Sequence, residues 1–192
     1  MPTILVFLIL VFLNFARTDR QWAFRRYRIE KDFFTGTFSI YDQFGRILLY
    51  RLESRYAITQ TAELFTYPSQ QIIASIRNTW SPLGRDAEIQ IFDLGYNQWI
   101  PGRITQSFPD YRIQYANRRL IMEQKAFSFR MEIYDEQQPH YILARIRTKL
   151  ASLNRYDIQV YADELPDVLY ILALAVYDYN RTGNIRSLPN GK

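Results

Sequence analysis

The sequence predicts a mainly β protein, a closed barrel of about twelve antiparallel strands around a central hydrophobic C-terminal helix, with a short N-terminal apolar segment. Three observations predict this fold. Between residues 27 and 162, apolar and polar residues alternate in short segments that turn residues separate. No helical period competes with this alternation before residue 163. The segment 164–181 is then apolar on every side of a helix, so the strands have a hydrophobic rod to enclose.

The expected strands follow one another as hairpins. Gly45 supplies the positive φ that a tight turn needs, and Gly95, Pro68–Ser69 and Ala116–Asn117 mark further turns. A longer turn, 136–140, reads EQQPH. Strands this regularly spaced suggest a sandwich or a barrel, and closure into a barrel removes the exposed edges. The expected strands are 28–34, 36–42, 46–54, 58–67, 71–80, 86–93, 98–108, 111–116, 118–126, 127–135, 141–150 and 156–162.

The helix is expected over residues 164–181, a length of roughly 27 Å at 1.5 Å per residue. Asp163, Glu164 and Asp167 complement the positive N-terminal end of a helix, and Gly183 is available as the stop. A helix that is apolar all round is either buried or spans a membrane. The uncharged run after Asp167 is only about ten residues long, well short of the roughly twenty that a membrane span requires. The sequence therefore predicts a helix inside the barrel, with these core residues: Leu169, Leu172, Leu174 and Val176.

Residues 1–16 contain an uncharged apolar run, TILVFLILVFLNFA, over 3–16. As a helix this run would be roughly 21 Å long, shorter than the roughly 30 Å hydrocarbon core of a bilayer. Three readings follow: a membrane anchor or interfacial helix, an extra element packed on the domain, or a cleaved signal. Arginines crowd the downstream flank, and no basic residue precedes the run, which favours retention on the cytoplasmic side.

A basic aromatic connector, residues 17–26, follows the apolar run. The formal net charge of the chain is +5, and residues 17–31 hold six basic and two acidic residues, which leaves four of those charges here. Arginines interleaved with aromatics are typical of a segment at a membrane interface. The arginines further along the chain are dispersed, so a nucleic-acid partner is not expected. The expected membrane or lipid contacts are Arg17, Arg20, Trp22, Arg25, Arg26 and Arg28.

Two segments give the chain a family resemblance. FSIYDQFGRILLYRL at 38–52 is a strand, an Asp-x-x-Gly turn and a strand, and YDIQVYADELPDVLYILALAVYDYN at 156–180 is a last strand and a hydrophobic helix. In this order, with about twelve strands between residues 25 and 182, they resemble the tubby C-terminal-like superfamily, which includes LURP-one-related proteins and phospholipid scramblases. The resemblance implies a barrel threaded by a helix and, in several members, binding to phosphoinositide-containing membranes rather than catalysis. Scramblase-like members add a proline-rich N-terminal region and cysteines for acylation, and this chain has neither.

Few residues here suggest catalysis, a cofactor or a metal. The chain has no cysteine, which excludes thiolate metal sites, cysteine nucleophiles and palmitoylation. His140 is the only histidine, and no G-x-S-x-G or HExxH motif accompanies it. Asp163, Glu164 and Asp167 are better explained as helix-start acids than as a cation site. We therefore expect no catalytic, cofactor-binding or metal residue, and no enzyme.

The 192 residues have no Pro/Gly/Ser-rich linker, so one domain is expected: the barrel over 27–183, with a tail at 184–192. The leading hypothesis is a membrane-associated binding module for acidic phospholipid headgroups, for a protein partner, or for both. The alternative is a structural accessory subunit of a larger membrane assembly, with the barrel as a rigid scaffold. We expect the barrel on the cytoplasmic side of a membrane, or secreted if the apolar run is a cleaved signal.

Overall fold

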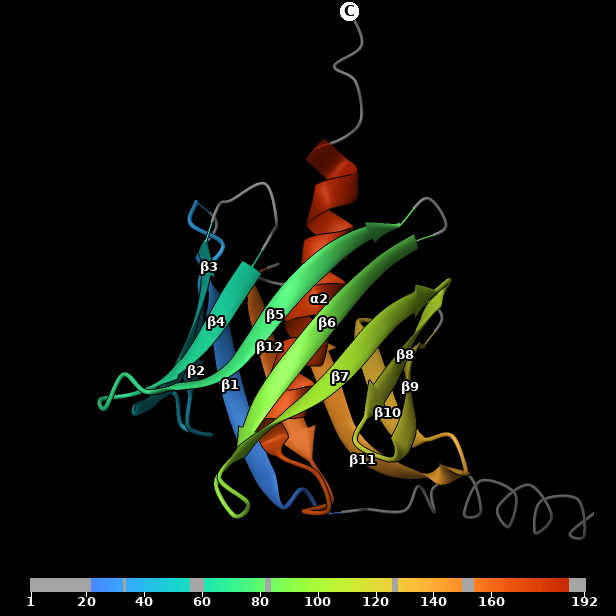
Figure 1. The fold of residues 1–192 in the computed structure, drawn as a ribbon, viewed down its shortest axis with the longest axis horizontal. Helices are drawn as coiled ribbons and strands as arrows, with labels where there is room; N and C mark the ends of the chain where they lie inside the picture. Colours follow the sequence, from blue (N-terminus) through green and yellow to red (C-terminus); the bar gives the residue numbers. More distant parts are fainter. Residues whose placement is uncertain are drawn as a thin grey trace, which may run out of the picture.

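A computed structural model shows a closed barrel with one helix running through it (Figure 1). The structure describes residues 22–32, 34–55, 61–81, 84–125, 128–149 and 154–186. The expected segment 1–16, residues 17–21 of the connector and residues 187–192 of the expected tail lie outside these residues. The strands are β1 (Arg25–Lys31), β2 (Phe38–Tyr41), β3 (Leu48–Arg55), β4 (Thr61–Thr66), β5 (Ile72–Ser81), β6 (Gly84–Asp93), β7 (Gln98–Ser107), β8 (Asp110–Tyr115), β9 (Arg118–Gln124), β10 (Arg130–Asp135), β11 (Gln138–Thr148) and β12 (Arg155–Val160), and the helix is α2 (Asp167–Arg186).

Every strand pairs antiparallel with its neighbours in sequence, and β1 closes the barrel against β12. At this closure Tyr27 lies opposite Ile158 and Ile29 lies opposite Tyr156. Residues alternate between a buried inner face and an outer face, as the period of two in the sequence requires. The predicted fold class is confirmed: a mainly β protein with a closed twelve-strand antiparallel barrel and a C-terminal helix.

The helix fills the barrel. Its residues from Val168 to Tyr177 are all buried, and Leu169, Leu172 and Leu174 have no exposed surface. Their side chains belong to one core cluster with the inward residues of the strands. Because apolar side chains cover the helix on all sides, only a surrounding wall removes them all from water.

The helix begins and ends later than the sequence suggested. It starts at Asp167 rather than at residue 164, because Pro166 disfavours helical dihedrals in the residue before it, Leu165. It also continues past Gly183 to Arg186. Within the described residues no helix is both long enough and apolar enough to cross a membrane.

The barrel has two rims, which the helix connects. We call the one where α2 begins the lower rim, as it is drawn in Figure 1. It carries the start of β1, the β12–α2 connection 161–166 and these five turns: 42–47, 67–71, 94–97, 116–117 and 136–137. The last turn is shorter than expected, because residues 138–140 already belong to β11 and a register shift absorbs the extra length. His140 is therefore an exposed strand residue rather than a turn residue.

Candidate functional site

The first turn of α2 is fixed to β1 by the carboxylate of Asp167. Arg25 donates from Nη2 to Oδ1 over 2.7 Å, and the hydroxyl of Tyr27 also donates to this carboxylate. Burial, followed by the hydrogen bond to Asp167, raises the pKa of Tyr27 far above its ordinary value. Arg25 is one of the expected lipid contacts; its guanidinium binds the start of the helix, and its side chain is 40% exposed.

Two other acids near the helix start, Asp135 and Glu164, are also paired. Arg118 donates to Asp135 over 2.7 Å and to Glu164 over 2.8 Å. The pKa of Asp135 is lowered, because hydrogen bonds from the Gln137 N–H and Arg118 outweigh the cost of burial. Throughout the described residues no group of His, Cys, Asp or Glu has an arrangement suited to a metal ion. These carboxylates thus hold the barrel and helix together.

The described part of the connector lies at the lower rim, where β1 begins. Trp22 is 82% exposed and Phe24 is 64% exposed, although both are large and apolar. Arg26 is exposed on the outer wall, and Arg28 is half-buried. Arg17 and Arg20 lie outside the described residues. The structure therefore places four of the six expected contact residues at one end of the barrel: Trp22, Arg25, Arg26 and Arg28.

The β2–β3 turn adds a residue pair that sequence reasoning missed. Phe44 is 63% exposed at its tip, and the guanidinium of Arg46 lies 5.9 Å from the centre of its ring. From β1, Nη1 of Arg28 approaches the Phe44 carbonyl oxygen at 3.4 Å. Two arginines thus contact Phe44, Arg46 at its ring and Arg28 at its backbone carbonyl. The only sequence signal for this residue pair was the Asp-x-x-Gly turn. That motif predicted the hairpin but did not predict that the apolar residue at its tip would be exposed.

Internal hydrogen bonds hold this turn in place. The Asp42 carboxylate accepts from the N–H groups of Arg46 at 2.7 Å and Ile47 at 3.1 Å. The Arg46 N–H is the main reason why the pKa of Asp42 is lowered. Gly45 has φ +70°, and a Cβ there would lie 2.6 Å from Nη1 of Arg28. The turn is therefore a preformed tip in which any residue other than glycine at position 45 would be strained and would displace the Arg28 side chain.

The next two turns along the rim also expose large apolar side chains. Leu94 and Tyr96 in the β6–β7 turn are each 77% exposed, and Tyr67 in the β4–β5 turn is 48% exposed. At the start of β7, Trp99 is 44% exposed and packs its ring on Phe92 at 5.3 Å. The three hairpin turns that follow the connector around the lower rim thus all present apolar tips.

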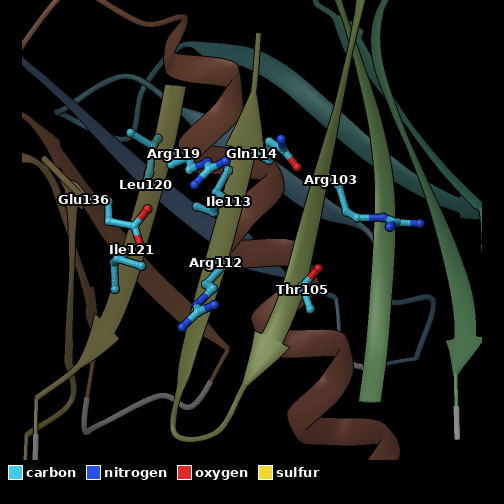
Figure 2. Close-up of a pocket in the computed structure, with 9 residues that line it drawn as sticks. All are labelled: Arg103, Thr105, Arg112, Ile113, Gln114, Arg119, Leu120, Ile121 and Glu136. Atoms are coloured by element: carbon cyan, nitrogen blue, oxygen red, sulfur yellow. The ribbon is translucent and has the colours of Figure 1, made fainter. Parts of the chain in front are cut away.

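A second candidate is a groove of about 320 Å³ on the outer wall of β7, β8 and β9 (Figure 2). Its basic residues are Arg103, Arg112 and Arg119. Figure 2 shows Arg103 pointing away from the other two, toward β6, where its Nη2 lies 4.0 Å from the Glu88 carboxylate. Glu136 adds a negative charge at the edge of the groove. The arginines do not converge on one point, so the groove lacks the forked geometry that fixes an anion.

The remaining basic residues on the wall are largely neutralised. Arg145 contacts Glu132 at 3.0 Å, and Lys149 contacts Asp157 at 3.3 Å.

No protein-family model matches the sequence, and no curated protein is significantly similar to it. Kinship with the tubby-like barrels therefore stays a prediction. Among the described residues, the lower rim, with its exposed apolar residues and arginines, is therefore the stronger candidate site.

Proposed function

We propose that the protein is a non-enzymatic, membrane-associated module that binds surfaces of acidic phospholipid. The observation that carries this proposal is the connector at the start of β1. Trp22 and Phe24 are exposed there beside Arg26, and only residues 17–21 separate them from the apolar run of residues 3–16. The amphipathic ring of a tryptophan settles at the level of the headgroups, where a phenylalanine adds apolar surface and arginines beside them face lipid phosphates.

The energies of these contacts suit a peripheral attachment. Each arginine near an anionic surface contributes on the order of 1 kcal/mol, a contribution that salt screens. An apolar segment too short to span comfortably supplies a second, salt-independent contribution. Two weak signals of this kind add up to one stable attachment. The resemblance to tubby-like barrels supports the same class of function.

Vesicle cosedimentation of the full chain tests the proposal. Vesicles of phosphatidylcholine with phosphatidylserine should bind the protein, and vesicles of phosphatidylcholine alone should bind it less. Deleting residues 1–16 should leave a weaker association that salt disrupts. The double substitution Arg20→Gln and Arg26→Gln should weaken binding further. Adding phosphoinositides to the vesicles then tests for headgroup preference.

The matched control removes two arginines from elsewhere on the wall, Arg77→Gln and Arg147→Gln, which are both exposed. This variant has the same net charge as the test variant, so equal losses would mean that only overall charge matters. A full chain that remains soluble, monomeric and indifferent to acidic vesicles would overturn the proposal. An accessory subunit would instead show little response to salt and would lose a protein partner on deletion of residues 1–16.

A further inference from the structure

We propose that the β2–β3 and β6–β7 turns, through Phe44, Ile47, Leu94 and Tyr96, enter the lipid interface and set which end of the barrel faces the membrane. This inference rests on the proposed function, because it names the part of the protein that the same membrane contacts. It adds to the connector a second element, made of residues between positions 44 and 96, which lie well beyond residues 17–26 in the chain. The occupant of this surface is a bilayer containing acidic phospholipid.

Exposure is the first argument. Ile47 is 61% exposed, a little less than Phe44 and the two tips of the β6–β7 turn. Single apolar residues on a surface are ordinary, whereas several along one rim mark an interaction site, and Tyr67 of the β4–β5 turn, which lies between these two turns, is also 48% exposed. These residues occupy turn tips, which are the parts of a barrel rim that first reach a flat surface.

Charge is the second argument. Arg26, Arg28 and Arg46 surround the connector and the β2–β3 turn, and among the described residues none of them forms an ion pair with a carboxylate. Several arginines elsewhere on the outer wall are paired with carboxylates, among them Arg130, Arg145 and Arg155. Apolar tips edged by unmatched arginines complement a layer of phosphates above hydrocarbon.

Two acids of the lower rim, Asp42 and Asp93, lie at the bases of these turns, where their carboxylates accept backbone N–H groups of the turns. The other acids of this rim lie away from the tips. Asp163 and Glu164 belong to the β12–α2 connection and Glu136 to the β10–β11 turn, and all three are exposed. A bilayer of acidic lipid would repel them. The protein should therefore lean on the side of the rim formed by the β2–β3, β4–β5 and β6–β7 turns, with the acidic side raised.

Continuity is the third argument, and it favours a bilayer over a protein surface. The connector leads into β1 at the lower rim, so any membrane attachment by the residues before it places this rim nearest to the lipid. The β2–β3 turn is preformed, so it loses little conformational entropy when it contacts that surface.

The absence of cysteine allows a direct test with single labels. Full-length variants Phe44→Cys, Tyr96→Cys and Phe108→Cys would each carry an environment-sensitive fluorophore. Phe108 is the control, since it is 90% exposed on the β7–β8 turn at the opposite rim. On addition of phosphatidylcholine–phosphatidylserine vesicles, the labels at positions 44 and 96 should shift to the blue, and the label at position 108 should not.

A second measurement uses unlabelled protein. The double substitution Phe44→Ser and Leu94→Ser should reduce the vesicle partition coefficient roughly tenfold, since each tip loses part of a buried apolar side chain. The matched control, Phe34→Ser and Phe108→Ser, alters two exposed phenylalanines of the opposite rim and should leave partition unchanged.

The outcomes separate this inference from the function on which it rests. If the full chain binds vesicles and neither label at the lower rim shifts, this inference is wrong and the proposed function stands. A shift only at position 108 would place the opposite rim on the lipid and would also overturn it. A shift at position 96 that requires a protein partner and no lipid would assign the tips to a protein surface. If the full chain binds no vesicle at all, both proposals fail.

Discussion

Lys31 of β1 and Asp178 of α2 form an ion pair inside the barrel, where the carboxylate side chain is only 1% exposed. The hydroxyl of Tyr156 donates to the same carboxylate from β12. Arg25 and Asp167 join the same two elements near the lower rim. The first strand thus holds the helix at two points, 11 residues apart on the helix and six apart on the strand.

Removing the Asp178 carboxylate should strongly destabilise the protein. Asp178→Ala leaves the ammonium of Lys31 in the barrel without its main partner, and breaking a buried pair in this way costs about 3–5 kcal/mol. Denaturant unfolding measures the loss. The double variant Lys31→Met and Asp178→Leu should recover most of it, because no charge remains to be compensated. If the double variant is no more stable than Asp178→Ala, the ion pair is not the reason for the loss.

The interior position of Leu172 makes it sensitive to both size and charge. Leu172→Ala should lower the free energy of unfolding by about 2–5 kcal/mol, because it leaves a cavity inside the barrel. Leu172→Asp should prevent folding, because it buries an unpaired charge. The control is Leu94→Asp at an exposed turn, which should fold normally. A soluble Leu172→Asp protein with unchanged thermal unfolding would contradict the central helix.

Alkaline pH should destabilise the fold through its buried tyrosines. Burial, followed by the charge of Asp178, raises the pKa of Tyr156 above its ordinary value of 10.0. The unfolded chain therefore ionises first, so the stability that this hydroxyl contributes is complete below pH 10 and is lost as the pH rises beyond it. Unfolding midpoints measured between pH 8 and pH 11 should fall above about pH 10. Tyr156→Phe should make that fall shallower, whereas a variant of the exposed Tyr96 should not.

The β2–β3 turn should respond to a single methyl group. Gly45→Ala places a side chain at φ +70° and against Arg28, so we expect a loss of about 1 kcal/mol or more. Gly95→Ala is the control, because its Cβ would meet only the Asp93 carboxylate oxygen at 3.2 Å. Thermal unfolding gives the loss, and the β2–β3 amide signals give its location. Equal effects at both glycines would show that the turn is not specially constrained.

Periodicity predicted most of this fold and little of its site. A period of two over residues 27–162 indicated the strands, and a helix apolar all round indicated what they enclose. The turn at 136–140 was predicted wrongly, because the register shift that puts His140 in β11 depends on its partner strand. Helix-start acids were expected near residue 164, but a local pattern does not reveal that Asp167 meets a residue 142 positions away.

The apolar tips were overlooked for a similar reason. Phe44 and Leu94 have the same character as core residues in sequence, and only their places on turns leave them exposed. The connector was predicted because its arginines and aromatics are adjacent in the chain. Arg46 is far from the connector in sequence. It comes near the connector only because β1 pairs with β2 and β2 pairs with β3.

The position of α2 has a consequence for biosynthesis. The element that fills the barrel follows all twelve strands, and β12, which closes the wall against β1, comes just before it. During translation the strands therefore leave the ribosome before the helix that fills the barrel. Their inward-facing apolar side chains stay exposed to water until the helix has been synthesised. Contacts between the first and last elements also make the fold slow to nucleate. The nascent chain should depend on chaperones over this interval, and a stop codon before residue 167 should yield an aggregating product rather than a smaller barrel.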